Sequence, residues 1–245
     1  MVICPAGLLT FLVNFIASNI AMRQIPYKWI SFLSLSIGLL LSPISLADTN
    51  LTEHSRSQVD PSQTILVMGD SLSAAYGINP ADGWVNRLRE RLAPAHYRTV
   101  NASVSGETSQ GGQQRLAALL KREAPSVVII ELGANDGLRG LDPQQIQTNL
   151  AQMISMSLNT KARVLLIGID LPANYGDEYR HSLARVYANL KVQYKVAFLD
   201  NLLKSVPIRE ENFQADHLHP VAAVQPNIEE SVYRALKPLL TAGRP

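Results

Sequence analysis

Short apolar runs alternate with longer amphipathic stretches from Thr64 onward. The runs over 127–130 and 164–167 are continuously apolar, which is typical of strands covered on both faces of a sheet. Strand-length runs separated by helix-length segments indicate βαβ units, a mostly parallel sheet and a three-layer α/β/α domain. The predicted strands are 64–68, 98–102, 126–132, 163–169 and 196–199, and the predicted helices are about 83–92, 109–122, 143–158, 178–193 and 220–240.

The first 47 residues have no acidic side chain and two basic ones, Arg23 and Lys28. An apolar, serine-rich stretch follows these cations and ends at Ser45-Leu46-Ala47, a small-x-small pattern. These are the parts of a secretory signal peptide, so we predict cleavage after Ala47 and a periplasmic or secreted protein. A membrane anchor is the alternative, although serines and a proline interrupt the apolar run.

A second apolar stretch, over residues 8–17, has no cation before it. Because Met22-Arg23-Gln24 is an ordinary signal-peptide start, we expect translation to begin at Met22 and residues 1–21 to be an over-extended reading frame. A genuine long leader or a two-segment anchor is the alternative. The expected division is a leader over 1–47, with the signal peptide at 22–47, a flexible polar lead-in over 48–63 and one folded domain over 64–245.

Composition narrows the class of protein. The 245 residues, 47% of them hydrophobic, suit one domain with a full core. The net charge of +2 falls to zero without Arg23 and Lys28, and no basic run indicates a nucleic-acid partner. The only cysteine, Cys4, lies in the predicted leader, so the mature domain is expected to lack disulfides, thiolate metal sites and a cysteine nucleophile.

Polar motifs follow four of the predicted strands. They are Gly69-Asp70-Ser71 and the segments 103–108, 133–136 and 171–176. Ligands bind at the carboxyl ends of the strands in open parallel sheets, so these motifs are expected to meet at one rim. The segment 216–219, before the last predicted helix, is expected to join them.

Ser71, His219 and Asp216 form a candidate set for nucleophilic catalysis. Serine is a poor nucleophile unless a neighbouring base takes its proton, and His219 is the best candidate base. Asp216 can accept the other imidazole N–H and fix the tautomer of the ring. Pro220 restricts His219 to an extended conformation and is expected to open the last helix. Alone, Asp-x-x-His more often indicates a turn hydrogen bond; its combination with Ser71 favours catalysis.

An acyl-transfer site also needs donors for the oxyanion. Gly106 can present its backbone N–H, because glycine lets a backbone approach a substrate closely. Asn135 can present its side-chain amide, and the Ser71 N–H is the natural third donor. In isolation, Gly106 is equally typical of an ordinary turn and Asn135 of an Asx-turn.

These motifs resemble the four sequence blocks of the SGNH (GDSL) hydrolases. The segments 101–109, 131–140 and 171–176 are more closely similar to the bacterial multifunctional esterases described as thioesterase I, protease I or lysophospholipase. The resemblance covers about residues 64–240, with every block in order. The blocks are Gly69-Asp70-Ser71-Leu72-Ser73, Gly106, Gly133-Ala134-Asn135-Asp136 and Asp216-His217-Leu218-His219-Pro220.

The resemblance implies a flavodoxin-like fold with a five-stranded parallel sheet of order 2-1-3-4-5. It implies Ser71 as nucleophile, His219 as base with Asp216 as its partner, and Ser71, Gly106 and Asn135 as oxyanion donors. It also implies that residues 64–245 form an SGNH hydrolase domain that needs no cofactor and acts on acyl esters, thioesters and lysophospholipids. A carbohydrate or peptide acyl-esterase on the same fold is the alternative. A monomer with transient contact to membrane lipid is expected.

Apolar residues near the rim are candidates for binding an acyl chain, although ordinary packing explains them equally well. The segment 137–141 matches a loop that lies over the acyl groove in this family. Ala75 and His217 stand where the family commonly has glycine, which leaves the substrate preference open. The candidate substrate-binding residues are Leu72, Leu138, Leu141 and Tyr175, with Tyr76 and Ile78 nearby.

Two other classes of function are alternatives. A metal-dependent hydrolase would use the oxygen and nitrogen donors of the rim, but the Asp-x-His and Gly-Asn-His elements of metallophosphoesterases are absent from the sequence. We therefore predict no metal site. A non-catalytic binding module on a hydrolase fold is the second alternative, and the intact set of Ser, Gly, Asn, Asp and His disfavours it. The donors concerned are Asp70, Asn135, Asp136, His217 and His219.

Overall fold

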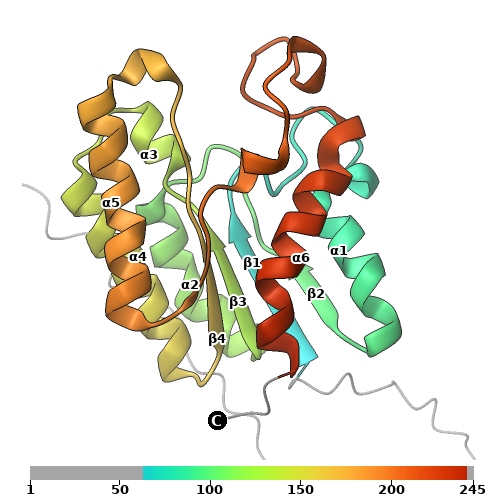
Figure 1. Ribbon diagram of the computed structural model, residues 1–245. Helices are drawn as coiled ribbons and strands as arrows, with labels where there is room; N and C mark the ends of the chain where they lie inside the picture. Colours follow the sequence, from blue (N-terminus) through green and yellow to red (C-terminus); the bar gives the residue numbers. More distant parts are fainter. Residues whose placement is uncertain (1–62, 242–245) are drawn as a thin grey trace, which may run out of the picture. The chain divides into compact units, whose positions relative to one another are not determined.

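The computed structural model describes residues 63–241, and Figure 1 shows their arrangement. The predicted leader over 1–47 and all of the predicted lead-in except residue 63 lie outside the described residues. Within the described part, five parallel strands form a sheet of order β2-β1-β3-β4-β5. This order confirms the α/β fold that the family resemblance implied.

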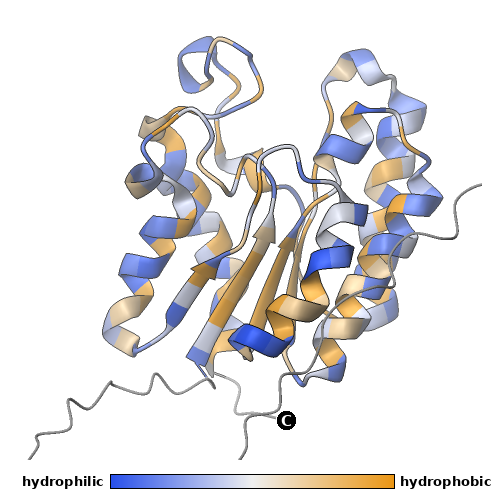
Figure 2. Ribbon diagram, turned by 180° about the vertical axis from the view of Figure 1, so that it is seen from behind, coloured by the Kyte–Doolittle hydropathy of each residue, from blue (hydrophilic) through white to orange (hydrophobic). Residues whose placement is uncertain are grey.

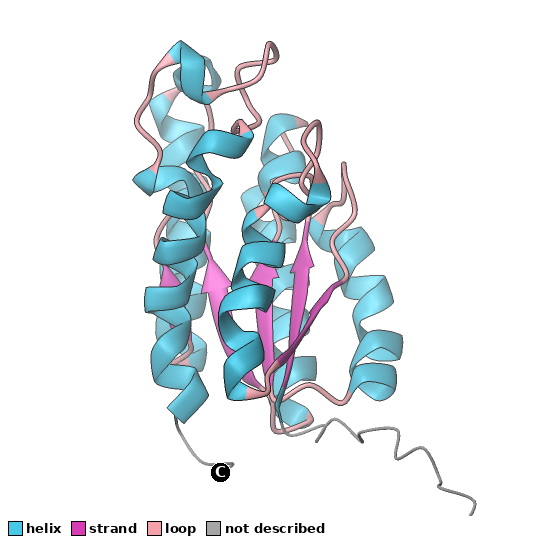
Figure 3. Ribbon diagram, turned by 90° about the vertical axis from the view of Figure 1, so that its right-hand side faces the viewer, coloured by secondary structure: helices cyan, strands magenta, loops and turns pink. Residues whose placement is uncertain are grey.

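The strands lie where the apolar runs placed them; β1 is one residue longer than predicted, and the other four are shorter. Every residue of the two central strands is buried, as a sheet covered on both faces requires. Figure 2 shows the apolar strands, and in Figure 3 all the strand arrows point the same way. The strands are β1 (Thr64–Gly69), β2 (Arg98–Asn101), β3 (Val127–Glu131), β4 (Arg163–Ile167) and β5 (Ala197–Leu199).

Helices cover both faces of the sheet. The α-helices are α1 (Trp84–Leu92), α2 (Ser109–Glu123), α3 (Ala134–Leu138), α4 (Pro143–Asn159), α5 (Asp177–Tyr194) and α6 (Gln225–Thr241). Helices α2, α4 and α5 pack on one face, against side chains such as Leu66 and Val128. Helices α1 and α6 pack on the other, against Ile65 and Ile129. Successive side chains of one strand thus enter opposite cores.

Local signals place two of the helix starts accurately. The Thr108 hydroxyl accepts a hydrogen bond from the Gly111 N–H (3.1 Å) and caps α2. The Asp142 carboxylate accepts one from the Gln144 N–H (2.9 Å) and caps α4, with Pro143 at the first helical position. Such caps contribute about 1 kcal/mol each and are visible in sequence.

The expected start of the last helix at Pro220 was wrong. Pro220 forms an isolated antiparallel bridge with Phe213, and α6 begins at Gln225 after a short 3₁₀ turn. The Gln214 N–H donates to the His219 carbonyl (2.8 Å), so the chain before Pro220 folds back on itself instead of entering a helix. The short helix α3 was expected as a loop.

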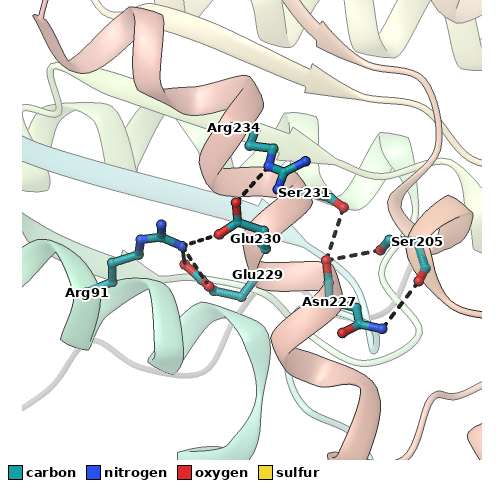
Figure 4. A network of polar contacts seen from close by, with 7 residues as sticks. All are labelled: Arg91, Ser205, Asn227, Glu229, Glu230, Ser231 and Arg234. Carbon is teal, nitrogen blue, oxygen red and sulfur yellow. Dashed lines mark hydrogen bonds and ion pairs between the residues drawn. The ribbon is translucent and has the colours of Figure 1, made fainter.

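A polar network joins α6 to its neighbours (Figure 4). The Arg91 guanidinium of α1 pairs with Glu229 (3.2 Å) and Glu230 (2.6 Å) of α6, and Arg234 also bonds Glu230 (2.7 Å). One turn earlier on α6, the Asn227 carbonyl accepts from the Ser205 hydroxyl (3.1 Å). Exposed ion pairs contribute only about 0–1 kcal/mol each, so the apolar contacts of α6 hold it in place.

No helix between residues 63 and 241 combines the length and the apolar character needed to span a membrane.

Candidate active site

Ser71 lies in a turn that follows β1, and we call residues 70–77 the nucleophile turn. The Asp70 carboxylate accepts a hydrogen bond from the Leu72 N–H (3.0 Å), and the Asp70 carbonyl accepts one from the Ala74 N–H (2.9 Å). Asp70 itself is only 1% exposed. A buried carboxylate therefore caps this turn from below and leaves Ser71 partly exposed at the carboxyl end of the sheet.

The two departures from the family pattern share one backbone conformation. Ala75 has φ 60° and His217 has φ 56°, both in the left-handed region that favours glycine. The Ala75 methyl is buried and faces Gly83, where an added Cβ would lie 2.6 Å from it. Ala75 therefore adopts a conformation that favours glycine, at some cost in backbone strain, with its methyl group packed against Gly83.

Residues 213–220 form the second part of the site, which we call the histidine loop. One Asp216 oxygen accepts hydrogen bonds from the backbone N–H groups of Leu218 (2.9 Å) and His219 (3.0 Å). The other lies 2.6 Å from the His219 Nδ1. The Asp-x-x-His spacing thus produces a turn in which one carboxylate holds both the backbone and the ring of His219.

The nucleophile turn and the histidine loop meet at the Ser71 hydroxyl. The His219 Nε2 lies 2.7 Å from the Ser71 Oγ, although the two residues are 148 positions apart in the sequence. With the hydrogen on Nδ1 facing Asp216, Nε2 is free to accept a proton from the hydroxyl. The structure therefore brings together the serine, the histidine and the aspartate that the sequence singled out.

The aromatic ring of Tyr76 lies against the imidazole, with ring centroids 4.6 Å apart. Tyr76 is 51% exposed, so its ring covers the outer side of His219 rather than filling the core. The Gln214 side chain donates to the Tyr76 carbonyl (2.8 Å) and to the Pro220 carbonyl (3.3 Å). Gln214 thus links the histidine loop directly to the nucleophile turn.

The two aspartates of the site have opposite pKa shifts. Burial raises the pKa of Asp70 to about 6, against the hydrogen bond from Leu72 and the nearby His219. Desolvation also acts to raise the pKa of Asp216, but the hydrogen bonds from His219 and Leu218 outweigh it and lower the pKa to about 2. Asp216 is therefore ionised at neutral pH, as an orienting partner for an imidazolium must be.

Two of the predicted oxyanion donors have backbone N–H groups that face no acceptor. Within residues 63–241, neither the Ser71 N–H nor the Gly106 N–H donates a hydrogen bond to another group. Gly106 is exposed and has φ 78°, and an added Cβ would meet nothing within 4 Å. The left-handed backbone, rather than crowding, is the reason that glycine suits this position.

Asn135 lies at the start of α3 and points back toward the nucleophile turn. Its side-chain nitrogen donates to the Glu107 carbonyl (2.9 Å) and to the Asp70 carboxylate (3.2 Å). Both amide hydrogens are therefore already engaged, which the sequence did not indicate. An oxyanion can receive one of them only if that bond is shared or exchanged.

The candidate substrate-binding residues lie in two groups. Leu72 packs against the core beside α1 and α6, whereas Leu138 and Tyr175 pack against the core on the other face. The Tyr175 hydroxyl donates to the Leu138 carbonyl (3.0 Å), and Leu141 is 41% exposed. Tyr175 therefore supports the segment 137–141, and an acyl-binding role for the four stays a prediction.

Two cavities are lined by other residues. One of about 480 Å³ is lined by residues of α2, α4 and α5, many of them glutamine, such as Gln113 and Gln152. The other, of about 310 Å³, is lined by Asp170, which follows β4, Arg180 of α5, and Asn201, which follows β5. Neither includes Ser71 or a candidate substrate-binding residue.

Most of the side chains that a metal-dependent hydrolase would use as metal ligands form hydrogen bonds within the protein. Asp136 accepts hydrogen bonds from the N–H (2.8 Å) and the hydroxyl (2.6 Å) of Ser109, at the start of α2. Asp70 and Asn135 bond each other, and His219 faces Ser71. Among residues 63–241, no three His, Cys, Asp or Glu side chains are grouped to hold a metal ion.

Sequence patterns did not single out three contributors to the geometry. Gln214 links the two loops, and the buried Glu131 accepts a hydrogen bond from the Ser73 hydroxyl (2.6 Å) beneath the nucleophile turn. A charged residue that ends an otherwise apolar strand was the available signal for Glu131. Ser73 belongs to the first family block, but its partner there was not predicted, and no signal marks Gln214, because its partners are distant in the sequence.

Comparison with known proteins identifies the family of this chain. The model of the GDSL-like lipase/acylhydrolase family matches residues 67–225. Over 186 residues the chain is 49% identical to esterase TesA of Pseudomonas aeruginosa, covering 75% of this chain and 92% of that protein. Over 177 residues it is 39% identical to thioesterase 1/protease 1/lysophospholipase L1 of Escherichia coli K12, covering 72% of this chain and 85% of that protein.

Solved structures confirm the fold. A crystal structure of TesA matches with a TM-score of 0.70 and 50% sequence identity, covering 73% of this chain and 100% of that one. The family model includes the end of β1 and the turn that carries Ser71. From the sequence motifs, the strand order and these matches together, the chain belongs to the GDSL-like lipase/acylhydrolase family.

Proposed function

We propose that this protein is a serine hydrolase that cleaves acyl esters and thioesters through an acyl-enzyme intermediate. The observation that carries the proposal is the continuous hydrogen-bonded chain from Asp216 through His219 to Ser71. This chain lies at the carboxyl end of a parallel sheet, where such folds bind their ligands. The arrangement supplies a nucleophile, a base and an orienting carboxylate in contact.

In the first step, the His219 Nε2 takes the proton of the Ser71 hydroxyl while the Oγ attacks the acyl carbon. The negative charge that forms on the carbonyl oxygen is stabilised by the N–H groups of Ser71 and Gly106, with Asn135 as the third donor. Donors of this kind contribute about 3–4 kcal/mol each in the transition state. The imidazolium then gives its proton to the leaving alcohol or thiol, and the acyl group stays on Ser71.

In the second step, His219 takes a proton from water, and the resulting hydroxide attacks the acyl-enzyme. Ser71 leaves with the proton from the imidazolium, and the free acid is released. Because the base must be neutral in both steps, the rate is expected to fall in acid. Asp216 stays ionised throughout and stabilises the imidazolium.

The names of the relatives guide the choice of substrate. One relative is named an esterase and another a thioesterase, protease and lysophospholipase, so we infer that lipid-derived acyl esters and thioesters are the substrate class. In a periplasmic or secreted protein, which the predicted signal peptide over 22–47 supports, lipid esters are more accessible than acyl-CoA. Carbohydrate or peptide acyl esters are the alternative class. We infer a monomer that contacts membrane lipid only transiently.

Hydrolysis rates along a series of p-nitrophenyl esters, from acetate to palmitate, test the proposal and its alternative. Lysophosphatidylcholine and an acetylated sugar complete the set. We expect the long and medium acyl chains and the lysolipid to be cleaved, whereas a preference for the acetylated sugar would favour the alternative. Ser71→Ala is the negative control, and turnover that survives this substitution would exclude the serine mechanism. His219→Ala removes the base, and its matched control is His181→Ala, which removes an exposed histidine of α5.

A further inference from the structure

A second buried carboxylate lies beneath the nucleophile turn, and the proposed reaction does not use it. Glu131 ends β3 opposite Gly69 of β1 and continues the row of Val127 and Ile129 toward the α1 and α6 face. Its side chain is completely buried. A carboxyl at the end of an apolar row needs a specific reason, because burying it costs free energy unless it is well bonded.

One oxygen of Glu131 holds the nucleophile turn at two points. The Ser73 hydroxyl donates to Oε2 (2.6 Å), and the Asp70 N–H approaches the same oxygen more loosely (3.4 Å). Ser71 lies between these two residues in the chain. The Ser73 carbonyl is held in turn by the Asn101 side chain at the end of β2 (2.8 Å).

Gly69 provides the space for this contact. An added Cβ at Gly69 would lie 2.5 Å from the Ser73 hydroxyl oxygen and 2.7 Å from the Glu131 Oε2. Both atoms would have to move before any side chain could enter. The first glycine of the family motif therefore allows the carboxyl of β3 to reach the turn after β1.

The charges around Glu131 favour its neutral form. Burial, and then the nearby Asp70, raise the pKa of Glu131 well above its ordinary value. The ionisable groups that change the pKa of Asp70 are Asp136 of α3, which raises it, and His219, which lowers it. Burial, together with the same carboxylates, raises the pKa of Tyr187 of α5. The second oxygen of Glu131, Oε1, has no hydrogen-bond partner within residues 63–241. A proton on Oε1 leaves Oε2 as the acceptor for Ser73 and Asp70.

We propose that Glu131 is a positioning residue of the active site, which fixes Ser71 by holding Ser73 and Asp70 on either side of it. The influence extends to Asn135, because Asp70 is also the acceptor for the Asn135 amide (3.2 Å). Glu131 contacts neither the Ser71 hydroxyl nor His219 and moves no proton in the reaction. The positioning role rests on the proposed function, whereas the neutral state of Glu131 does not.

Kinetics of two substitutions test the positioning role. Glu131→Gln keeps a carbonyl acceptor for Ser73 and Asp70, and we expect its kcat to stay within about threefold of wild type. Glu131→Leu removes the acceptor, and we expect kcat to fall about 10- to 100-fold with little change in KM, as displacement of a reacting group does. The rate at which a phosphonate ester labels Ser71 is expected to fall in parallel.

A second pair of variants, with smaller changes to the core, keeps the test valid if Glu131→Leu does not fold. Ser73→Ala removes the hydroxyl that joins the turn to Glu131, and we expect kcat to fall about three- to tenfold. Ser126→Ala is the matched control, because this buried serine bonds the Thr64 carbonyl at the opposite end of β1 and β3 (3.2 Å). It is expected to cost stability without changing kcat. Equal kcat in Ser73→Ala, Glu131→Leu and wild type would overturn the positioning role.

Unfolding as a function of pH tests the neutral state separately. A folded chain that keeps the Glu131 proton loses stability, relative to the unfolded chain, as the pH rises above the ordinary value of 4.5. The unfolding constant of wild type, divided by that of Glu131→Gln, should therefore rise about tenfold for each pH unit above this ordinary value, until the pH reaches the pKa of Glu131 in the folded chain. A constant ratio would show that the pKa of Glu131 is not raised in the fold and would overturn its neutral state.

The outcomes distinguish this inference from the proposed function. If the proposed function fails, wild-type protein neither hydrolyses the esters nor is labelled at Ser71, and the positioning role fails with it. The unfolding ratio still reports the state of Glu131 in that case. If only the inference fails, wild type is active and labelled, and Glu131→Leu is equally so.

Discussion

The nucleophile turn and the histidine loop contribute one reacting group each, but different forces hold them. The nucleophile turn is anchored from below by the buried Asp70 and Glu131. The histidine loop is more exposed and is held by Asp216 and by backbone bonds within residues 213–220. One half of the site is therefore part of the core, and the other is a surface loop with its own internal order. Substitutions in the two halves should separate effects on stability from effects on activity.

The largest expected effect comes from removing either reacting group. Ser71→Ala and His219→Ala should each lower kcat by at least about 10⁴-fold, because the nucleophile and its base act as a unit. The double variant should lose little more than either single one. Steady-state kinetics on one p-nitrophenyl ester provide the measurement. Additive losses in the double variant would show that the two residues act independently.

The link between the two regions should have a smaller effect. Gln214→Ala removes the hydrogen bonds from the Gln214 side chain to the Tyr76 and Pro220 carbonyls. One such bond contributes about 1 kcal/mol, so we expect kcat to fall about tenfold and the free energy of unfolding to fall by about 1 kcal/mol. Gln193→Ala, on the exposed surface of α5, is the control. An unchanged kcat would mean that the loops keep their register without Gln214.

Changes of pH should destabilise the two regions in opposite directions. The pKa of Asp70, ordinarily 3.8, is raised to about 6 by burial, so the folded state binds this proton more tightly than the unfolded chain. The associated stability, about 3 kcal/mol, is present below about pH 4 and is lost as the pH rises to about 6. The pKa of Asp216 is lowered to about 2, so its contribution is present above about pH 4 and is lost in acid.

Urea unfolding of three proteins across this pH range measures both effects. Asp70→Asn should reduce the loss of stability between about pH 4 and 6, where Glu131 contributes the remaining loss, and Asp216→Asn should reduce the loss between about pH 4 and 2. Each variant should leave the other window nearly unchanged. Parallel curves for wild type and both variants would contradict the assigned shifts.

The smallest expected effects concern the two residues at left-handed backbone positions. His217→Gly relieves the strain of an exposed residue in the histidine loop, and we expect a gain of about 0.5–1 kcal/mol. Ala75→Gly relieves similar strain in the nucleophile turn but removes a buried methyl group, which costs about 0.8 kcal/mol. Its net effect should be close to zero. Thermal unfolding of both variants measures the difference, and a larger gain for Ala75→Gly would reverse the expected order.

The sequence predicted the fold to the extent that local patterns determine it. Continuous apolar runs located the buried strands, and amphipathic stretches located the helices, two of which begin where Thr108 and Asp142 cap them. The strand order came from the family resemblance, because periodicity does not say which strands are neighbours. The start of α6 was misplaced, because a bridge between Phe213 and Pro220 replaces the helix that a proline commonly opens.

The site was predictable where its partners are close in sequence or belong to a family motif. The turn from Asp216 to His219 is of the first kind, and the contact of His219 with Ser71 is of the second. The contact of Gln214 with Tyr76, which joins residues 138 positions apart, has no local pattern. The engagement of both Asn135 hydrogens likewise depends on how β1, α3 and the Glu107 loop pack together.

Helix α6 follows the histidine loop directly and buries Ile228, Val232 and Leu236 against the sheet. Until this last helix docks, a growing or partly folded chain carries an alcohol at the end of its first strand without any base to activate it. Ester cleavage is therefore expected to require both ends of the folded domain, the first strand and the last helix. On the proposed function, turnover is then a measure of whether this last helix has docked, and a chain shortened before α6 is expected to be inactive.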